Sequence, residues 1–293
     1  MREFVIMTDS DTEIPYTFAE AHQVPVFLMP YTINGEESLF DLGKTTDYAG
    51  FYHSLREGAN ASTSTRSTYE IQCFYEDILK TGKDILYVCF SSQLSAHHDL
   101  AQMARKAALE NYPEARIEIV DSLGIAMGAG LLVYHAVRLK EEGKTMEEIM
   151  QWLLENRMRS LHFFSVDSLN YLKKTGRVSA VTATLGTMLD LKPILTLTKE
   201  GKIVAFDKVK GKKKVVKYLA DLAEKNYVED DICKELMVVC HGDNLAQAQA
   251  LKEAITQKLE FKEVWLMDVG PVIGSHCGPG VMAFLMMGKE REL

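Results

Sequence analysis

Short apolar runs alternate with segments of helical periodicity along most of the chain. The apolar runs span residues 4–7, 24–29, 85–90 and 117–120, and polar or turn residues bound most of them, which is typical of buried strands. Apolar residues at helical spacing predict helices over residues 69–79, 95–110, 126–142 and 145–156. This alternation predicts βαβ units, and hence a mostly parallel sheet with helices on both faces. Ligands of such sheets lie beyond the carboxyl ends of the strands.

The pattern changes after a predicted strand at residues 160–165. Residues 173–217 are rich in Lys and carry little acid, and a strand–helix–strand pattern then returns at residues 236–240, 246–258 and 264–267. We therefore predict an α/β protein of two domains, residues 1–160 and 161–293. The first has a mostly parallel sheet flanked by helices. The second is a smaller mixed α/β domain, and a ligand cleft lies between them.

Composition narrows the class of protein. The 293 residues include 33 Lys and Arg against 41 Asp and Glu, a net charge of −8, which argues against a general nucleic-acid binder. The start, MREFVIMTDSD, has too short an apolar run for a signal peptide, and no stretch approaches the roughly 18 apolar residues of a membrane span. We expect a cytoplasmic protein without stable membrane insertion. Its five scattered cysteines favour buried thiols over a disulfide framework or a zinc site.

Three polar segments follow predicted strands or open predicted helices. They are residues 8–15 (TDSDTEIP), 61–67 (ASTSTRS) and 91–95 (SSQLS). Each has two interpretations, because the same hydroxyls and carboxylates that cap a helix also bind ligands. Two hydroxyl-rich loops at corresponding strand ends can converge on one anion. The first segment is interpreted mainly as a helix cap.

Two glycine-rich segments complete the set of motifs. Residues 120–130 (VDSLGIAMGAG) match neither G-x-G-x-x-G nor G-x-x-x-x-G-K-[ST], so they do not support a nucleotide site, and their glycines favour close packing of a helix. Residues 270–280 (GPVIGSHCGPG) predict a tightly bent backbone that holds His276 near its centre. A neutral imidazole there can donate one hydrogen bond to a carboxylate.

Hydrolytic and metal chemistry have little support. The hydrolase elbow G-x-S-x-G is absent, and the nearest string, residues 274–278 (GSHCG), has Ser in the wrong place. His97, His98 and Asp99 are adjacent rather than four residues apart, and H-E-x-x-H is absent, so no metal site is predicted. An exposed or capping role is expected for both histidines.

Together these segments resemble the DegV family, the fatty-acid-binding proteins that serve bacterial fatty acid kinases. The resemblance runs from residue 5 to about residue 291. Its parts are residues 8–15, 63–64, 91–95, 120–130, 171–179 (YLKKTGRVS), 191–195 (LKPIL) and 270–280. It implies two α/β domains with a long-chain fatty acid, such as palmitate, buried between them. It also implies a role in phospholipid metabolism, with no cofactor and no catalytic residue of the chain's own.

The resemblance assigns the head-group residues one by one. Thr63 and Ser95 match the positions that hold the fatty acid carboxylate, and His276 matches a histidine near the same head group. Supporting positions are Ser64, Ser92 and Gly274. Neutral hydroxyl donors would leave the carboxylate ionised and unpaired with a strong cation, as suits a nucleophile toward the γ-phosphate of ATP on a partner.

Some positions depart from the family pattern. Ala96, His97 and His98 stand where the family usually has Gly-Thr and an aromatic residue. Lys210 stands where many members have an Arg that docks the ATP-binding kinase subunit, and Lys lacks the bidentate fork of Arg. Lys208 and Lys210 begin a basic stretch, which is either a solvated helix start or a docking face for an acidic kinase subunit.

Three functions are therefore compared. The first is a non-catalytic carrier that presents a fatty acid to a separate ATP-dependent kinase. The second is a stand-alone enzyme acting on a small carboxylated or phosphorylated substrate at the same cleft. The third is a lipid-responsive interaction protein that signals through the basic stretch. The chain length of the acid, the oligomeric state and the residues lining the pocket are not specified by the sequence.

Overall fold

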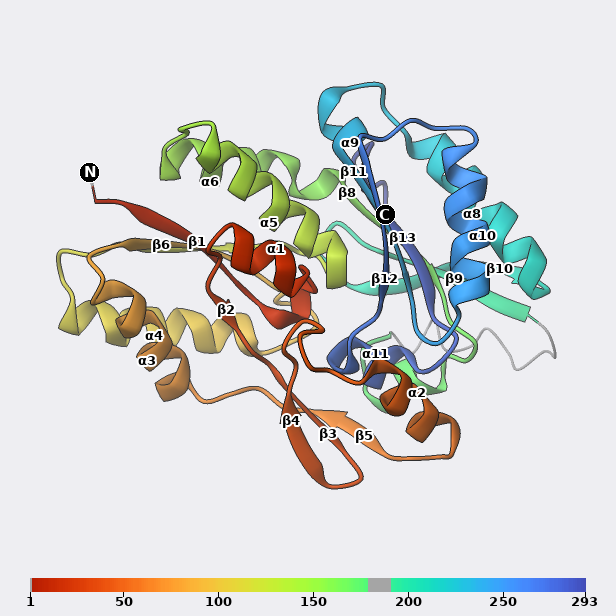
Figure 1. Ribbon diagram of the computed structural model, residues 1–293, viewed down its shortest axis with the longest axis horizontal. Helices are drawn as coiled ribbons and strands as arrows, with labels where there is room; N and C mark the ends of the chain where they lie inside the picture. Colours follow the sequence, from red (N-terminus) through yellow and green to blue (C-terminus); the bar gives the residue numbers. More distant parts are fainter. Residues whose placement is uncertain (1, 179–190) are drawn as a thin grey trace.

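The computed structural model describes residues 2–178 and 191–293, whose strands form three sheets (Figure 1). The first is the predicted parallel sheet, in the order β2-β1-β6-β7. Its strands are β1 (Phe4–Asp9), β2 (Val26–Phe27), β6 (Asp84–Cys89) and β7 (Ile117–Asp121). Helices α3 (Thr68–Leu79) and α4 (His97–Asn111) cover one face, and α5 (Ala126–Glu141) and α6 (Met146–Asn156) cover the other. The predicted α/β class is confirmed.

The second sheet is mixed and has six strands, in the order β10-β9-β8-β13-β11-β12. They are β8 (Ser160–Ser165), β9 (Leu191–Leu197), β10 (Ile203–Lys210), β11 (Leu236–His241), β12 (Glu263–Asp268) and β13 (Met282–Met287). Only β11 and β12 run parallel among the described neighbours. Helices α8 (Lys212–Asn226) and α10 (Leu245–Thr256) pack together on one face, where Leu219, Leu251 and Phe284 are buried.

Helix α5 lies between the two sheets and is buried along most of its length. It packs against β1 and β6 of the first sheet and against β8 and β13 of the second. At Gly128 an added Cβ would overlap the imidazole of His162 in β8. The same imidazole accepts a hydrogen bond from the Ile125 backbone N–H at 3.1 Å. The glycines of this segment therefore permit close helix packing, as the sequence indicated.

A small antiparallel sheet, in the order β4-β3-β5, was not predicted. It contains β3 (Pro30–Ile33), β4 (Glu36–Leu39) and β5 (Ala61–Thr63). Asn34 and Gly35 join β3 to β4 with φ values of 52° and 88°, as a two-residue hairpin turn requires. The single strand expected at residues 24–29 is therefore wrong in extent, because β2 ends at Phe27 and the chain then crosses to this small antiparallel sheet.

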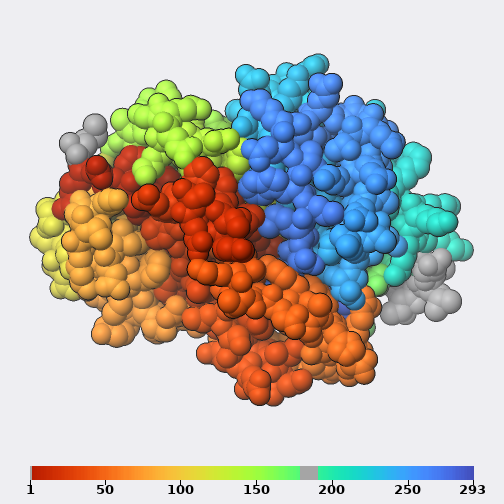
Figure 2. Space-filling model, in the orientation of Figure 1, coloured from red at the N-terminus to blue at the C-terminus, as the bar shows by residue number. Residues whose placement is uncertain are grey.

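Residues from the first half of the chain pack against the second half. Helix α2 (Tyr48–Arg56) follows the small sheet, and its Tyr52 hydroxyl donates to the Val269 carbonyl at 2.8 Å. Arg56 pairs with Asp243 at 2.5 Å. In Figure 2 the orange segment accordingly lies against the blue half. The six-stranded sheet begins with β8, but the division into domains 1–160 and 161–293 stays a prediction.

Short helices complete the described chain. They are η1 (Ser10–Thr12), α1 (Tyr16–Ala21), η2 (Arg157–Arg159), α7 (Asn170–Lys174), α9 (Asp231–Glu235) and α11 (Pro271–Cys277). The bent loop expected over residues 270–280 is wrong for most of its length, because Pro271 starts a helix and only Gly278 and Gly280 take positive φ. Among the helices of residues 2–178 and 191–293, none combines the length and apolar character needed to cross a bilayer.

Candidate functional site

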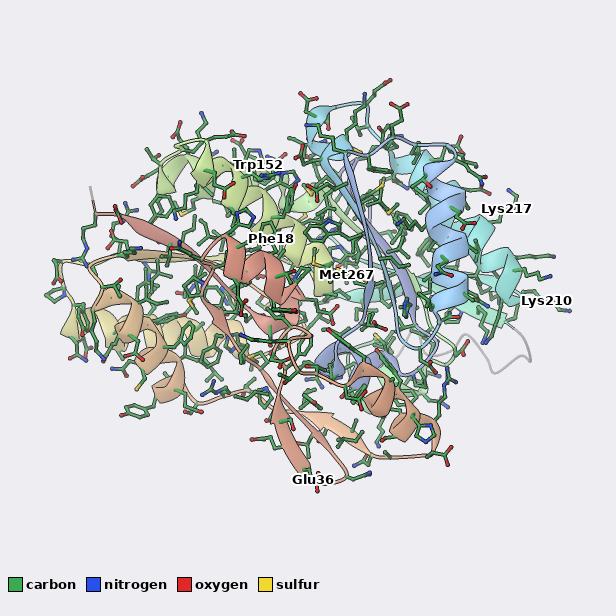
Figure 3. The ribbon with its side chains drawn as sticks, viewed as in Figure 1. Phe18, Glu36, Trp152, Lys210, Lys217 and Met267 are labelled. Carbon is green, nitrogen blue, oxygen red and sulfur yellow. The ribbon has the colours of Figure 1, made fainter. Side chains whose placement is uncertain are left out.

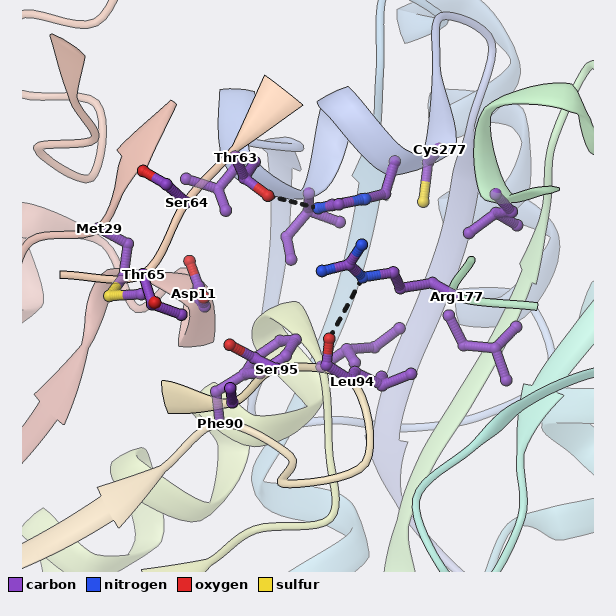
Figure 4. Close-up of a pocket in the computed structure, with 17 residues that line it drawn as sticks. Asp11, Met29, Thr63, Ser64, Thr65, Phe90, Leu94, Ser95, Arg177 and Cys277 are labelled. Carbon is purple, nitrogen blue, oxygen red and sulfur yellow. Dashed lines mark hydrogen bonds between the residues drawn. The ribbon is translucent and has the colours of Figure 1, made fainter. Parts of the chain in front are cut away.

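A cavity lies beyond the carboxyl ends of the parallel strands, the edge at which such sheets bind their ligands (Figure 4). Strand β5 and helix α11 close it from the other side. Its polar lining residues are Asp11, Thr63, Ser64, Thr65, Ser95, Arg177 and His276. Its larger apolar lining residues are Met29, Phe90, Leu94, Ile125, Leu172, Ile203, Val272 and Ile273. Ser64 and Thr65 are exposed, so the polar end meets the surface.

Thr63 and His276 are brought together from positions 213 residues apart. The Thr63 Oγ1 and His276 Nε2 atoms lie 2.9 Å apart, while the His276 Nδ1 atom is buried without a hydrogen-bond partner among the described residues. Burial, and then the positive charge of Arg177, lower the pKa of His276 to about 4. The imidazole is therefore neutral near pH 7, and it can exchange one hydrogen bond with the threonine hydroxyl.

Ser95 lines the same cavity just before helix α4. Its Oγ accepts a hydrogen bond from the His97 backbone N–H at 3.2 Å, which leaves the hydroxyl proton free to be donated into the cavity. The helix begins at His97, two residues later than predicted. Thr63, Ser95 and His276, selected from the sequence, thus surround one space.

Arg177 also lines this cavity, and sequence reasoning did not assign it a role. Its guanidinium Nε donates to the Leu94 carbonyl at 3.3 Å, which connects the segment after α7 to the loop before α4 (Figure 4). The expectation that hydroxyl donors leave the carboxylate without a strong cation stays a prediction, although this arginine lines the same cavity. Arg177 lies within the segment at residues 171–179. The sequence feature that could have drawn attention to it is an arginine directly after the turn glycine Gly176. Ser179, which ends that segment, lies outside the described residues.

The acidic segment after β1 turns inward rather than capping helix α1. Asp9 caps the η1 turn by accepting from the Asp11 backbone N–H at 3.1 Å, whereas α1 has no side-chain cap. Asp11 lines the cavity, and burial raises its pKa well above the ordinary value. Glu13 accepts from the Gly270 N–H at 2.6 Å, and burial raises its pKa to about 8. Like Arg177, Asp11 lines the cavity and received no role from the sequence.

The expected exposed or capping role is wrong for His97, which is buried. Its Nε2 atom lies 2.7 Å from the Tyr87 hydroxyl, and its ring stacks on Phe27 at 5.5 Å between centroids. Ligand atoms of Asp9, Cys89 and His97 all lie within 4.8 Å of one another. Asp9 already accepts from the Phe90 N–H at 3.0 Å and from Tyr87 at 2.8 Å, and burial raises the pKa of Cys89. These properties favour a hydrogen-bonded cluster over metal ligation.

Of the three supporting residues named from the sequence, only Ser64 is among the residues that line the cavity. Ser92 donates its backbone N–H to Asp121 at 3.2 Å and is not among the residues that line the cavity. Gly274 lies within α11, where an added Cβ would come 2.7 Å from the Tyr52 hydroxyl. Glycine at this position therefore allows α11 to pack closely on α2.

The basic stretch lies at the edge of the second sheet. Lys208 and Lys210 are exposed on β10, and exposed lysines continue into the first turns of α8 (Figure 3). The Lys212 Nζ atom lies 3.5 Å from Asp167 Oδ2, and the Lys217 Nζ atom lies 2.7 Å from Asp221 Oδ2. The stretch is thus both a solvated helix start and a cationic surface.

Known proteins resemble the chain over nearly its whole length. The family described as "Uncharacterised protein, DegV family" matches residues 3–289. A DegV domain-containing protein of Clostridium perfringens is 36% identical over 292 residues, a coverage of 100% for this chain and for the relative. One from Streptococcus pyogenes serotype M1 is 32% identical over 289 residues, covering 98% of this chain and 99% of the relative.

Solved structures agree with the fold. A DegV family protein from Thermus thermophilus, described for its fatty acid binding, matches with a TM-score of 0.84 and 28% identity over 98% of this chain and 100% of that one. A fatty acid binding DegV family protein from Streptococcus agalactiae has a TM-score of 0.86 at 24% identity, over 99% of this chain and 100% of its own. The latter likeness concerns the fold alone.

Proposed function

The chain belongs to the DegV family, and on this premise we propose that it binds a long-chain fatty acid in the cavity that β5 and α11 close against the ends of the parallel strands. The observation that carries the proposal is that Thr63, Ser95 and His276 line one cavity together with many apolar side chains. The fatty acid binding described for the Thermus thermophilus protein, at 28% identity, supports the same ligand class.

The carboxylate is held by a short chain of hydrogen bonds. With the proton on Nε2, His276 donates to Thr63 Oγ1, and the Thr63 hydroxyl then donates to the carboxylate. Ser95 donates its free hydroxyl proton from the opposite loop. His276 is thus a positioning residue that acts through Thr63. Arg177, on the same cavity, contributes positive charge to the ionised head group.

The tail supplies most of the affinity. Burying about twelve methylene groups contributes on the order of 10 kcal/mol before the entropy of ordering is subtracted. Phe90, Leu172 and Ile273 provide apolar surface from three separate segments. The head-group residues then fix the orientation of the acid rather than its total affinity.

We propose further that the loaded protein is a non-catalytic carrier for a separate ATP-dependent fatty acid kinase. Support comes from the exposed Ser64 and Thr65, which bring the head-group end to the surface, and from the lack of a G-x-x-x-x-G-K-[ST] motif. Lys208 and Lys210 would attract an acidic kinase surface, chiefly by raising the association rate.

The first experiment is mass spectrometry of an organic extract of the purified protein. A near-stoichiometric long-chain fatty acid is the expected result, and the Thr63→Val/Ser95→Ala double variant should retain less of it. An empty protein that also fails to take up palmitate or oleate would contradict fatty acid binding. Acyl phosphate formed from ATP by this chain alone, trapped as the hydroxamate, would instead favour the stand-alone enzyme.

The kinase step needs its own assay. We expect Lys208→Glu/Lys210→Glu to slow association with a fatty acid kinase subunit about tenfold at low salt. The control is Lys80→Glu/Lys144→Glu, which makes the same charge change on exposed lysines of the N-terminal half. Equal rates for the two double variants would refute the proposed docking face.

A further inference from the structure

Asp11 presents a second carboxyl group to the head-group end of the cavity. Figure 4 places it between Thr65 and Ser95, on the far side of the space from Arg177. The residue is 4% exposed, and its Oδ1 atom is buried with no hydrogen-bond partner among the described residues. A buried polar atom without a protein partner is destabilising unless a ligand or water meets it.

The surroundings of Asp11 favour its neutral form. Burial raises the pKa of Asp11 well above the ordinary value, and the nearby carboxyl groups of Asp9 and Glu13 raise it further. Helix α5 packs against this turn through Gly130, which carries no charge. A Cβ added to Gly130 would lie 2.7 Å from the Thr12 carbonyl oxygen. A protonated carboxyl group has one O–H to donate.

The remaining titratable or charged groups of the cavity lie on α11 and after α7. The pKa of His276 is lowered to about 4, and that of Cys277 is raised to about 12, in both cases by burial first. Neither group changes charge near neutral pH. Asp11 and Glu13 are the carboxyl groups of this turn whose pKa values are raised, that of Glu13 to about 8.

We propose that Asp11 is a third head-group residue, whose carboxylic acid O–H donates to the ionised carboxylate of the bound fatty acid. This inference rests on the proposed fatty acid binding. Two carboxyl groups then share one proton across the hydrogen bond, so the complex retains a proton that the empty protein loses at alkaline pH. Binding should consequently take up a proton and weaken as the pH rises, by at most tenfold per pH unit.

The test is calorimetric titration of the whole protein, stripped of lipid, with oleate between about pH 6 and about pH 10. Buffers of different ionisation enthalpy report the protons taken up on binding. We expect the wild-type protein to take up a fraction approaching one proton at the alkaline end. Asp11→Asn keeps an N–H donor of the same shape, so it should bind oleate with a pH-independent Kd and no uptake.

Glu13→Gln is the matched control, because Glu13 is also a buried carboxyl group but does not line the cavity. This variant should still take up a proton on binding, with the onset of uptake moved to lower pH because Glu13 no longer raises the pKa of Asp11. Wild-type binding without proton uptake, or uptake that persists in Asp11→Asn, would overturn the inference. Failure of the wild-type protein to bind oleate at any pH would overturn the proposed function instead, so the two failures are distinguishable.

Discussion

Glu13 joins the two halves of the molecule through a carboxyl group that is almost completely buried. It accepts from the Gly270 N–H at 2.6 Å, and its Oε2 atom has no partner among the described residues. Burial is the main cause that raises its pKa from 4.5 to about 8; the Gly270 hydrogen bond opposes this rise, and the charge of Asp268 adds to it. The Glu13→Gln variant removes the titration and keeps an acceptor for Gly270.

The sign of the pH effect follows from proton binding. Between pH 4.5 and about 8 the folded protein holds a proton on Glu13 that the unfolded chain has released. The contribution of Glu13 to the free energy of unfolding therefore falls as the pH rises through this window and is constant above it. The full shift corresponds to about 5 kcal/mol at about 1.36 kcal/mol per pH unit.

Urea unfolding of both proteins at pH 5 and at pH 9 measures this effect. We expect Glu13→Gln to differ little from the wild-type protein at pH 5 and to be more stable at pH 9, by up to about 5 kcal/mol. Groups remote from Glu13 titrate equally in both proteins, so the difference reports Glu13 together with its neighbour Asp11, whose pKa Glu13 raises. A stability difference that does not change with pH would refute the assignment of a buried, protonated carboxyl group.

Three further predictions concern the site and the central helix. Thr63→Val and Ser95→Ala should each weaken oleate binding by roughly 1–3 kcal/mol in a competition assay, whereas Ser54→Ala on α2 should not; equal affinities would contradict the head-group assignment. The imidazole of His276 should titrate near pH 4 by NMR, and a midpoint near 6.5 would show that the ring is solvated. Gly128→Ala should lower the free energy of unfolding by roughly 1–3 kcal/mol through overlap with β8, and an unchanged urea midpoint would argue against close packing there.

The sequence predicted best those helices and strands whose own residues show a clear apolar pattern. The strand at residues 160–165 has the same bounds as β8, and the helix predicted over 69–79 begins one residue early in the structure, at Thr68. Strand β4 was missed because all four of its residues are exposed, so it has no apolar alternation. The Asn34-Gly35 pair between two short β-rich runs was an available hairpin signal.

The site was predictable only in part, because local motifs can be found in a sequence whereas contacts between distant segments cannot. Hydroxyl loops at strand ends pointed to Thr63 and Ser95, because parallel strands end at one edge of the sheet. His97 was misplaced, although it shares a helical face with Ala101, Ala104 and Ala108, all buried. Arg177 could not be assigned, because its position in the cavity depends on tertiary contact with the loop before α4.

The hydrogen bond between Thr63 and His276 has a consequence for biosynthesis. Its two residues are 213 positions apart, and α11 reaches the site only after most of the second sheet has been synthesised. A nascent chain can complete the parallel sheet as an early folding unit, since domains fold as units from the amino terminus during translation. The contact between Thr63 and His276 must wait until α11 has been synthesised, so the proposed fatty acid site can form only late in translation.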